Sequence, residues 1–159
     1  MGFAISDMKL TCAAFADGKS IPEQYTAYAD NIQPAFSWSN VPDGTRSFAL
    51  TCHDPDAPLV TPDGKYGYVH WVLYNIPGDV TELPENCGDY TCGTNNSDTQ
   101  EYFGPRAPQG HGLHRYFFWV LALDVETDLE PGLTLWELLE KVEPNLIGMN
   151  RVCGTYRKD

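Results

Sequence analysis

Basic residues are scarce in this chain. Lys and Arg together number 10 against 22 Asp and Glu, which gives a formal net charge of -12 at pH 7. Recognition of nucleic-acid phosphates normally needs a basic face, and anionic membrane surfaces oppose acidic proteins. We therefore expect no nucleic-acid partner and no stable membrane anchoring, so any anionic ligand must be held by local hydrogen-bond donors.

Long apolar runs and targeting signals are also missing. No apolar stretch reaches the roughly 18 residues that mark a membrane-spanning helix, and the opening MGFAISDMKL lacks the basic and apolar regions of a signal peptide. An odd number of cysteines without a secretion signal predicts reduced thiols and a cytoplasmic location. Cys87 and Cys92 are close enough in sequence to leave a disulfide between them open. The five cysteines, which show no zinc-type spacing, are Cys12, Cys52, Cys87, Cys92 and Cys153.

The sequence motifs of common catalytic machinery are absent. There is no G-x-S-x-G elbow, no Walker loop and no G-x-G-x-x-G fingerprint. No internal repeat or linker divides the chain. A length of 159 residues with 42% hydrophobic residues is enough for one well-buried core. We therefore expect a single domain over residues 1–159.

Short apolar segments typical of strands make up most of the chain. A capping box at Thr134–Glu137 followed by helical spacing predicts one helix that ends before Pro144, and a further helical turn is expected over residues 145–150. The predicted fold is mainly β, an antiparallel β-sandwich with one or two C-terminal helices. Strands are expected within residues 3–15, 33–40, 47–53, 68–76, 116–123 and 151–156.

Two polar stretches stand out beside these buried segments. Residues 104–124, GPRAPQGHGLHRYFFWVLALD, begin as a loop rich in proline, glycine and histidine and end as a buried strand. Residues 53–58, HDPDAP, also follow a strand-like segment. Functional groups are commonly presented on loops that a rigid scaffold positions. We predict that the two loops meet.

Their acidic and histidine side chains form the candidate site. In it, imidazoles would donate hydrogen bonds to an anion, and neighbouring carboxylates would favour the imidazolium form. Arginine side chains and a nest of backbone amides near Gly104 and Gly110 would add further donors. The candidates are Asp54, Asp56, His70, His111 and His114, with Arg106 and Arg115.

Strand periodicity predicts which neighbours these histidines have. Alternation places His70 on one face with Val72, Tyr74 and Ile76. It likewise places His114 on one face with three apolar or aromatic side chains, those of Tyr116, Phe118 and Val120.

Other interpretations of the same residues stay open. Asp and His are ligands for zinc, manganese or iron, although this spacing matches no dense metal motif. A His–Asp pair is also a general base, but no nucleophile is evident, since an apolar strand cysteine such as Cys52 is usually inert. Asp54 before Pro55 is also typical of a simple turn cap, and a strand histidine such as His70 is often only a core residue.

Three segments that follow one another in a fixed order show a resemblance to a known protein family. DPDAP at 54–58, HWVLYNIP at 70–77 and GP…P…G…HRY at 104–116 together resemble the phosphatidylethanolamine-binding protein family, also called Raf kinase inhibitor-like proteins. The likeness covers nearly the whole chain, and the Gly-Thr-Tyr at 154–156 is similar to the bacterial and archaeal branch.

The resemblance implies two antiparallel sheets, a few helices and a small anion pocket for phosphate, a phosphoryl headgroup or an acetate-like ion. It also implies a cis peptide at Ala57–Pro58, turning both aspartates of the loop toward the pocket. Arg106, His111 and Arg115 would lie at the rim. The implied ligand-binding residues are Asp54, Asp56, His70, Gly104, Pro105, His114 and Tyr116.

Two departures from the family pattern affect the pocket. Ala107 stands where a proline is common, which predicts a looser loop, and residues 27–30 replace a Cys-Asp-Gly-like segment at one rim.

We interpret the chain as a non-enzymatic binding protein for a small phosphate- or carboxylate-bearing ligand, without a cofactor. It would modulate a protein partner such as a kinase or protease, and the bacterial-type relatives suggest a homodimer. The alternatives are a hydrolase or lyase that uses His70, His114 and Asp54, with or without a metal, and a scaffold that acts through the loop at 91–100.

Overall fold

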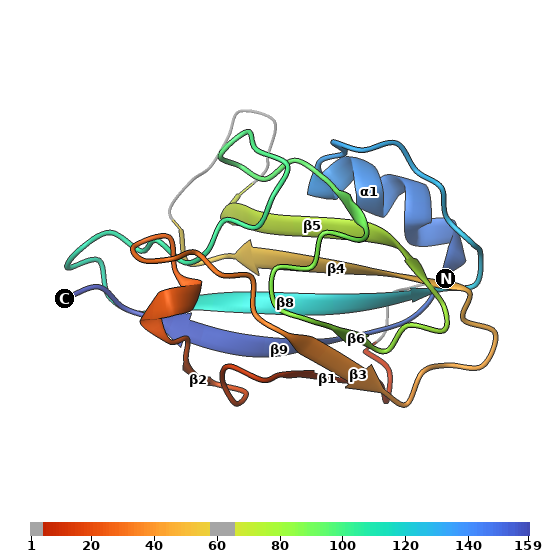
Figure 1. Ribbon diagram of the computed structural model, residues 1–159, viewed down its shortest axis with the longest axis horizontal. Coiled ribbons are helices and arrows are strands. Elements are labelled where there is room, and N and C mark those ends of the chain that lie inside the picture. Colours follow the sequence, from red (N-terminus) through yellow and green to blue (C-terminus); the bar gives the residue numbers. More distant parts are fainter. Residues whose placement is uncertain (1–4, 58–65) are drawn as a thin grey trace.

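The computed structural model describes residues 5–57 and 66–159, which form two packed sheets and one short helix (Figure 1). The larger sheet has the strand order β2-β9-β8-β4-β5-β7 and the smaller one β1-β3-β6. The smaller sheet consists of β1 (Lys9–Cys12), β3 (Phe36–Ser39) and β6 (Glu82–Leu83). The larger sheet consists of β2 (Lys19–Ser20), β4 (Ser47–Asp54), β5 (Tyr68–Pro77), β7 (Thr91–Cys92), β8 (His114–Leu123) and β9 (Leu146–Tyr156).

Strand β8 lies at the centre of the larger sheet, between β4 and β9. Its apolar run is buried on both faces from Val120 to Leu123, whereas Phe117 and Trp119, on one face of its first half, are only partly buried, so the prediction of burial on both faces holds for part of the strand. Tyr116, Phe118 and Val120 point into the core shared with the smaller sheet, which confirms the predicted face of β8. All pairings in both sheets are antiparallel except the two-residue pairing of β2 with β9.

The helix α1 (Leu135–Val142) covers the other face of the larger sheet. Its capping box is confirmed: Glu137 N donates to Thr134 Oγ1 at 3.2 Å, and Thr134 N donates to Glu137 Oε2 at 2.9 Å. Three buried side chains of the helix pack in a second core with residues of β4, β5 and β8; they are Leu135, Leu138 and Val142.

The expected helical turn over residues 145–150 is wrong. Single turns of 3-10 helix cover η1 (Glu23–Tyr25) and η2 (Glu143–Asn145), and β9 begins at Leu146. Met149 pairs with Leu121 and Asn150 with Val120 of β8. Pairing with the central strand therefore determines the conformation of these residues, because tertiary context overrides weak local preference.

The predicted orientation of His70 is also partly wrong. The register of β4 with β5 shifts at His70, which is the extra residue of a bulge. Its ring lies against Tyr116 with centroids 5.1 Å apart, whereas Val72 and Tyr74 pack in the core under α1. A bulge bends its strand and redirects a side chain, so strict alternation fails at the one residue of β5 that matters most for the site.

The fold class predicted from the sequence is confirmed: mostly strands in two sheets with one short C-terminal helix. All five cysteines are free thiols, so Cys87 and Cys92 do not form a disulfide. In the part of the chain that the structure describes, no helix is long and apolar enough to cross a membrane.

Candidate functional site

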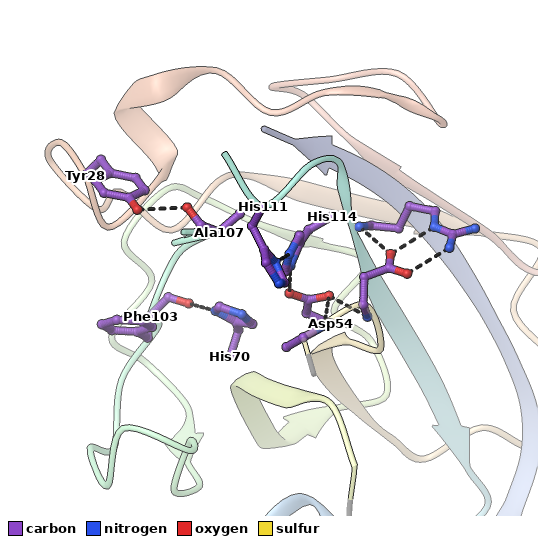
Figure 2. A network of polar contacts seen from close by, with 10 residues as sticks. Tyr28, Asp54, His70, Phe103, Ala107, His111 and His114 are labelled. Carbon is purple, nitrogen blue, oxygen red and sulfur yellow. Dashed lines mark hydrogen bonds and ion pairs between the residues drawn. The ribbon is translucent and has the colours of Figure 1, made fainter. Parts of the chain in front are cut away.

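A cavity of about 360 Å³ opens at one end of the strands of the larger sheet, where β4 ends and where β5 and β8 begin. Its volume is at the lower end of the range for small-molecule sites. The two polar loops predicted to meet do so here, because Asp54 and His114 lie side by side (Figure 2). The cavity is lined by Asp54, Ala57, Tyr68, His70, Ser97, Phe103, Arg106, Ala107, Pro108, His111, His114 and Tyr116.

A chain of three polar side chains runs along one wall. His114 Nδ1 is 2.7 Å from Asp54 Oδ2, and His114 Nε2 is 2.7 Å from His111 Nδ1. Asp54 also accepts from the amides of Asp56 and Ala57, at 2.8 and 3.2 Å. Burial raises the pKa of the Asp54 carboxyl, and its bond to His114 opposes that rise. The carboxylate therefore holds the His114 ring in place and closes the turn after β4.

His70 faces the cavity in a neutral form. Its Nδ1 lies 2.7 Å from the carbonyl oxygen of Phe103, which accepts only, so the proton sits on Nδ1 (Figure 2). Burial lowers the pKa of His70 to about 4, against the raising effect of the backbone around Phe103 and Gly104. Burial therefore disfavours the imidazolium form predicted from the sequence at His70.

Tyr116 supplies a hydroxyl group without a partner. Its side chain is fully buried, and its OH has no hydrogen-bond partner among residues 5–57 and 66–159. Burial raises the pKa of the phenol, while the nearby backbone amides of Arg106 and Ala107 act in the opposite direction. The phenol therefore keeps its proton at neutral pH. A buried polar group that lacks a partner is uncommon, and a bound water, ion or ligand is one way to satisfy it.

Asp56 and Arg115 lie outside the cavity lining. The Arg115 guanidinium donates to both carboxylate oxygens of Asp56 at 2.8 and 2.9 Å, and the Arg115 amide donates at 2.9 Å. These bonds to Arg115 hold the pKa of Asp56 below its ordinary value. This pair ties the turn after β4 to the start of β8. The expected cis peptide at Ala57–Pro58 involves Pro58, which lies outside the described residues.

Gly104 and Pro105 support the cavity wall rather than lining it. Gly104 N donates to Asn31 Oδ1 at 2.6 Å, and Pro105 O accepts from Ala27 N at 3.0 Å. Gly110 N donates to the carbonyl of Lys158 at 2.9 Å. The amides of Gly104 and Gly110 are thus already bonded, so the predicted nest does not lie at these two residues.

The close approach at Gly104 predicts a large cost for any side chain there. A Cβ at this position would lie 2.3 Å from Tyr25 O and 2.8 Å from Asn31 Oδ1. We expect Gly104→Ala to lower the free energy of unfolding by about 1–3 kcal/mol, as overpacking does. Urea denaturation should show a lower midpoint. Gly88→Ala is the matched control, because a Cβ there meets nothing within 4 Å. Equal midpoints for the two variants would contradict this explanation of Gly104.

The loop around Ala107 is held by a contact that the sequence did not reveal. Tyr28 OH donates to Ala107 O at 2.8 Å, so a residue of the unusual segment at 27–30 fixes the loop (Figure 2). The Tyr28 ring also stacks on Tyr156, with centroids 6.1 Å apart. Ala107 itself is buried. The predicted loosening is therefore offset by the second departure from the family pattern.

Sequence reasoning found part of the cavity and missed the rest. Asp54, His70, His114 and Tyr116 line it, as do Arg106 and His111. Ala57, Ala107 and Pro108 lie inside the two loop motifs, and Tyr68 lies two residues before His70, so the sequence carried a signal for these four. Ser97 and Phe103 come from segments without a recognisable motif. The missed lining residues are Ala57, Tyr68, Ser97, Phe103, Ala107 and Pro108.

Potential metal ligands do not converge in the described ranges. Within residues 5–57 and 66–159, no group of three His, Cys, Asp or Glu side chains is arranged to hold a metal ion. The imidazoles of His111 and His114 are bonded to one another, and His114 is also bonded to Asp54. The side chains of the wall are thus engaged in a hydrogen-bond chain.

The fold and the cavity together define a two-sheet β-protein with a small cavity at the ends of its central strands. The family model described as phosphatidylethanolamine-binding protein matches residues 11–157. The chain therefore belongs to the phosphatidylethanolamine-binding protein family.

Relatives and solved structures agree with this membership. The chain is 42% identical over 158 residues to the UPF0098 protein of Methanothermobacter thermautotrophicus, covering 95% of this chain and 99% of the relative. The crystal structure of the homologue CT736 from Chlamydia trachomatis is 36% identical, with a TM-score of 0.84 over 96% of this chain and 98% of the other. That of Escherichia coli YbcL is 27% identical, with a TM-score of 0.87 over 97% and 100%.

Proposed function

We propose that this protein binds a small phosphate- or carboxylate-bearing ligand in the cavity at the end of β4, β5 and β8. The observation that carries the proposal is Tyr116, which lines the cavity and whose buried hydroxyl has no partner among the described residues. A ligand oxygen is the simplest group to accept from this donor. Membership of a family named for phosphatidylethanolamine supports a phosphoryl group as the ligand chemistry.

Other donors around the cavity support an anion. Arg106 is exposed at the mouth of the cavity, and among the described lining residues it is the one with a permanent positive charge. The backbone amides of Arg106 and Ala107 lie near the Tyr116 hydroxyl. The charged carboxylate of the lining, Asp54, is already bonded to His114 and to two backbone amides. The local field at the mouth is thus less negative than the net charge of the chain suggests.

No observation favours the alternative of a hydrolase or lyase. Cys52 is fully buried, and burial raises the pKa of its thiol, so it is not an activated nucleophile. Asp54, His114 and His111 resemble a proton relay, but among the described residues that line the cavity the only serine, threonine or cysteine is Ser97, whose hydroxyl is bonded to Tyr68. A binding role needs no nucleophile and is therefore compatible with these lining residues.

Replacing His70 with alanine tests the pocket directly. We expect His70→Ala to weaken binding of inorganic phosphate and phosphoethanolamine by at least about 10-fold. The substitution removes an imidazole that lines the cavity, together with its hydrogen bond to the carbonyl oxygen of Phe103. The measurement is a titration that follows the histidine ring signals by NMR. His53→Ala is the matched control, since His53 is the residue before Asp54 but does not line the cavity. Wild-type affinity in the folded His70→Ala protein would refute the pocket assignment.

Location and partners extend the same proposal. Five free thiols are in keeping with a reducing, cytoplasmic environment. Modulation of a protein partner such as a kinase or protease, and a homodimeric state, remain part of the proposal by analogy with the family. A pulldown with wild-type and His70→Ala protein would show whether any partner depends on the pocket.

A further inference from the structure

We propose that the backbone N–H of Ala107 is a ligand-binding donor, which together with the N–H of Arg106 and the hydroxyl of Tyr116 holds one anionic oxygen of the ligand. This inference rests on the proposed function and names the atoms that recognise the anion. It follows from three hydrogen-bond donors that lie at one wall of the cavity and have no acceptor in the described part of the chain.

The amide of Ala107 is buried and lacks a partner. Ala107 is 2% exposed and lines the cavity. Among residues 5–57 and 66–159, no oxygen accepts from the N–H of Ala107 or from that of Arg106, whereas the amides of Gly104 and Gly110 in the same loop are both bonded. Buried backbone N–H groups without a partner are rare. These two successive amides are therefore free to donate to a ligand oxygen.

Two contacts outside the cavity lining orient these amides. Ala27 N donates to the carbonyl oxygen of Pro105 at 3.0 Å. That carbonyl and the N–H of Arg106 belong to one planar trans peptide unit, so they point in opposite directions. The bond to Ala27 therefore turns the N–H of Arg106 away from Ala27. The hydroxyl of Tyr28 holds the carbonyl of Ala107 in the same way, at 2.8 Å (Figure 2).

The oriented amides face the hydroxyl of Tyr116. Burial raises the pKa of this phenol, and the N–H groups of Arg106 and Ala107 act against that rise, as dipoles do when their positive ends face the oxygen. No hydrogen bond joins the hydroxyl to either amide. All three protons therefore remain free for an acceptor that lies among them.

An anionic oxygen is the acceptor that suits this group of donors. One such oxygen accepts several hydrogen bonds at once, and each is stronger than a bond to a neutral acceptor. The carboxylate of the lining, Asp54, does not compete for the donors, because it is bonded to His114 and to two backbone amides. The three donors therefore fit an unesterified oxygen of a phosphate ester or an oxygen of a carboxylate.

The residue type at position 107 decides whether this donor exists. A proline nitrogen carries no N–H, and Ala107 stands where a proline is common in the family pattern. Alanine therefore adds a donor to the cavity. The bond from Tyr28 to the carbonyl of Ala107 still holds the loop, because it uses the other end of the residue.

Replacing Ala107 with proline tests the proposal. The probe is dimethyl phosphate, a monoanion without an ionisable proton near neutral pH. We expect Ala107→Pro to bind it about 10- to 100-fold more weakly than wild type, the effect of one hydrogen bond to a charged group. Isothermal titration calorimetry at pH 7 measures the affinity. Ala107→Gly is the matched control, since it keeps the N–H, and should bind at least about 5-fold more tightly than Ala107→Pro.

An ester at the same position separates the lost donor from any change of loop shape. Incorporating lactic acid in place of Ala107 exchanges the N–H for an oxygen and keeps the methyl group. This variant should lose as much affinity for dimethyl phosphate as Ala107→Pro does. Wild-type affinity in the folded ester variant would overturn the inference, whatever the result with proline.

The amide protons give a direct readout in the wild-type protein. On addition of dimethyl phosphate, the NMR signal of the Ala107 N–H should move downfield and saturate. The N–H of Gly104 is the internal control, because it already donates to Asn31 Oδ1 at 2.6 Å and should stay in place. A stationary Ala107 signal at saturating dimethyl phosphate would contradict the inference.

The outcomes separate the inference from the proposed function. Equal affinity of wild type and the ester variant for dimethyl phosphate would overturn the inference and leave the anion pocket intact. Binding of neither dimethyl phosphate nor acetate to wild type would overturn both. Loss of either anion in Ala107→Pro and the ester variant supports the inference, and the anion that wild type binds more tightly identifies the ligand as a phosphate ester or a carboxylate.

Discussion

Replacing Asp54 with alanine should lower the free energy of unfolding by about 3–5 kcal/mol, because it removes the acceptor shared by three buried hydrogen-bond donors. The Asp54 and His114 side chains are each 3% exposed and 2.7 Å apart. The same carboxylate accepts from the amides of Asp56 and Ala57. Alanine would leave three donors without their acceptor in a water-poor site, and the turn after β4 would lose its closure.

Urea denaturation at pH 7 measures this loss. Asp128→Ala is the control, because that carboxyl is exposed and a surface substitution changes stability by only about 0.5 kcal/mol. Asp54→Asn should be intermediate, since its amide oxygen can still accept from the two backbone amides. If the free energy of unfolding of the Asp54→Ala protein lay within about 1 kcal/mol of the wild-type value, the buried Asp54–His114 pair would contribute no more to stability than an exposed pair does.

The second large effect is a loss of stability in mild acid that originates at His70. Its pKa in the folded protein is about 4, lowered by burial from the ordinary value of 6.5. The unfolded chain therefore takes up this proton first as pH falls. The stabilising contribution is complete above pH 6.5 and is lost progressively toward pH 4. Between pH 7.5 and pH 5 the loss should amount to about 2 kcal/mol.

Comparison of wild type with His70→Gln isolates this contribution. Both proteins carry the other histidines, so the difference between their stability losses from pH 7.5 to pH 5 reports His70 alone. We expect the variant to start less stable and to lose about 2 kcal/mol less over that range. Parallel pH profiles would mean that the His70 ring is as easily protonated in the folded state as in the unfolded one.

Local sequence patterns predicted most of the fold. The capping box at Thr134–Glu137 defined the helix, and the apolar runs at 47–53, 68–76 and 116–123 defined the central strands. These signals are local, because a cap and an apolar period depend on neighbours in sequence. Residues 145–150 escaped prediction because pairing with β8 determines their conformation.

The site was predicted to the extent that its residues lie in sequence motifs. Asp54 and His114 are 60 residues apart and were correctly expected to meet. The bulge at His70 was not predictable, because it depends on how β4 and β5 align across the sheet. Nor was the state of its ring, since the carbonyl of Phe103 that fixes the tautomer belongs to a loop without a motif.

The cavity divides into a floor and a mouth, and this division limits how the protein can diverge. The floor residues Asp54, His70 and His114 are buried and bonded into the sheet and its loops, so changing them endangers the fold as well as the ligand. Arg106 and His111 are exposed on a loop at the mouth. Selection can therefore alter the outer contacts, and with them ligand preference, at little cost in stability. A single framework can in this way give rise to paralogues that share one buried floor and differ at the mouth.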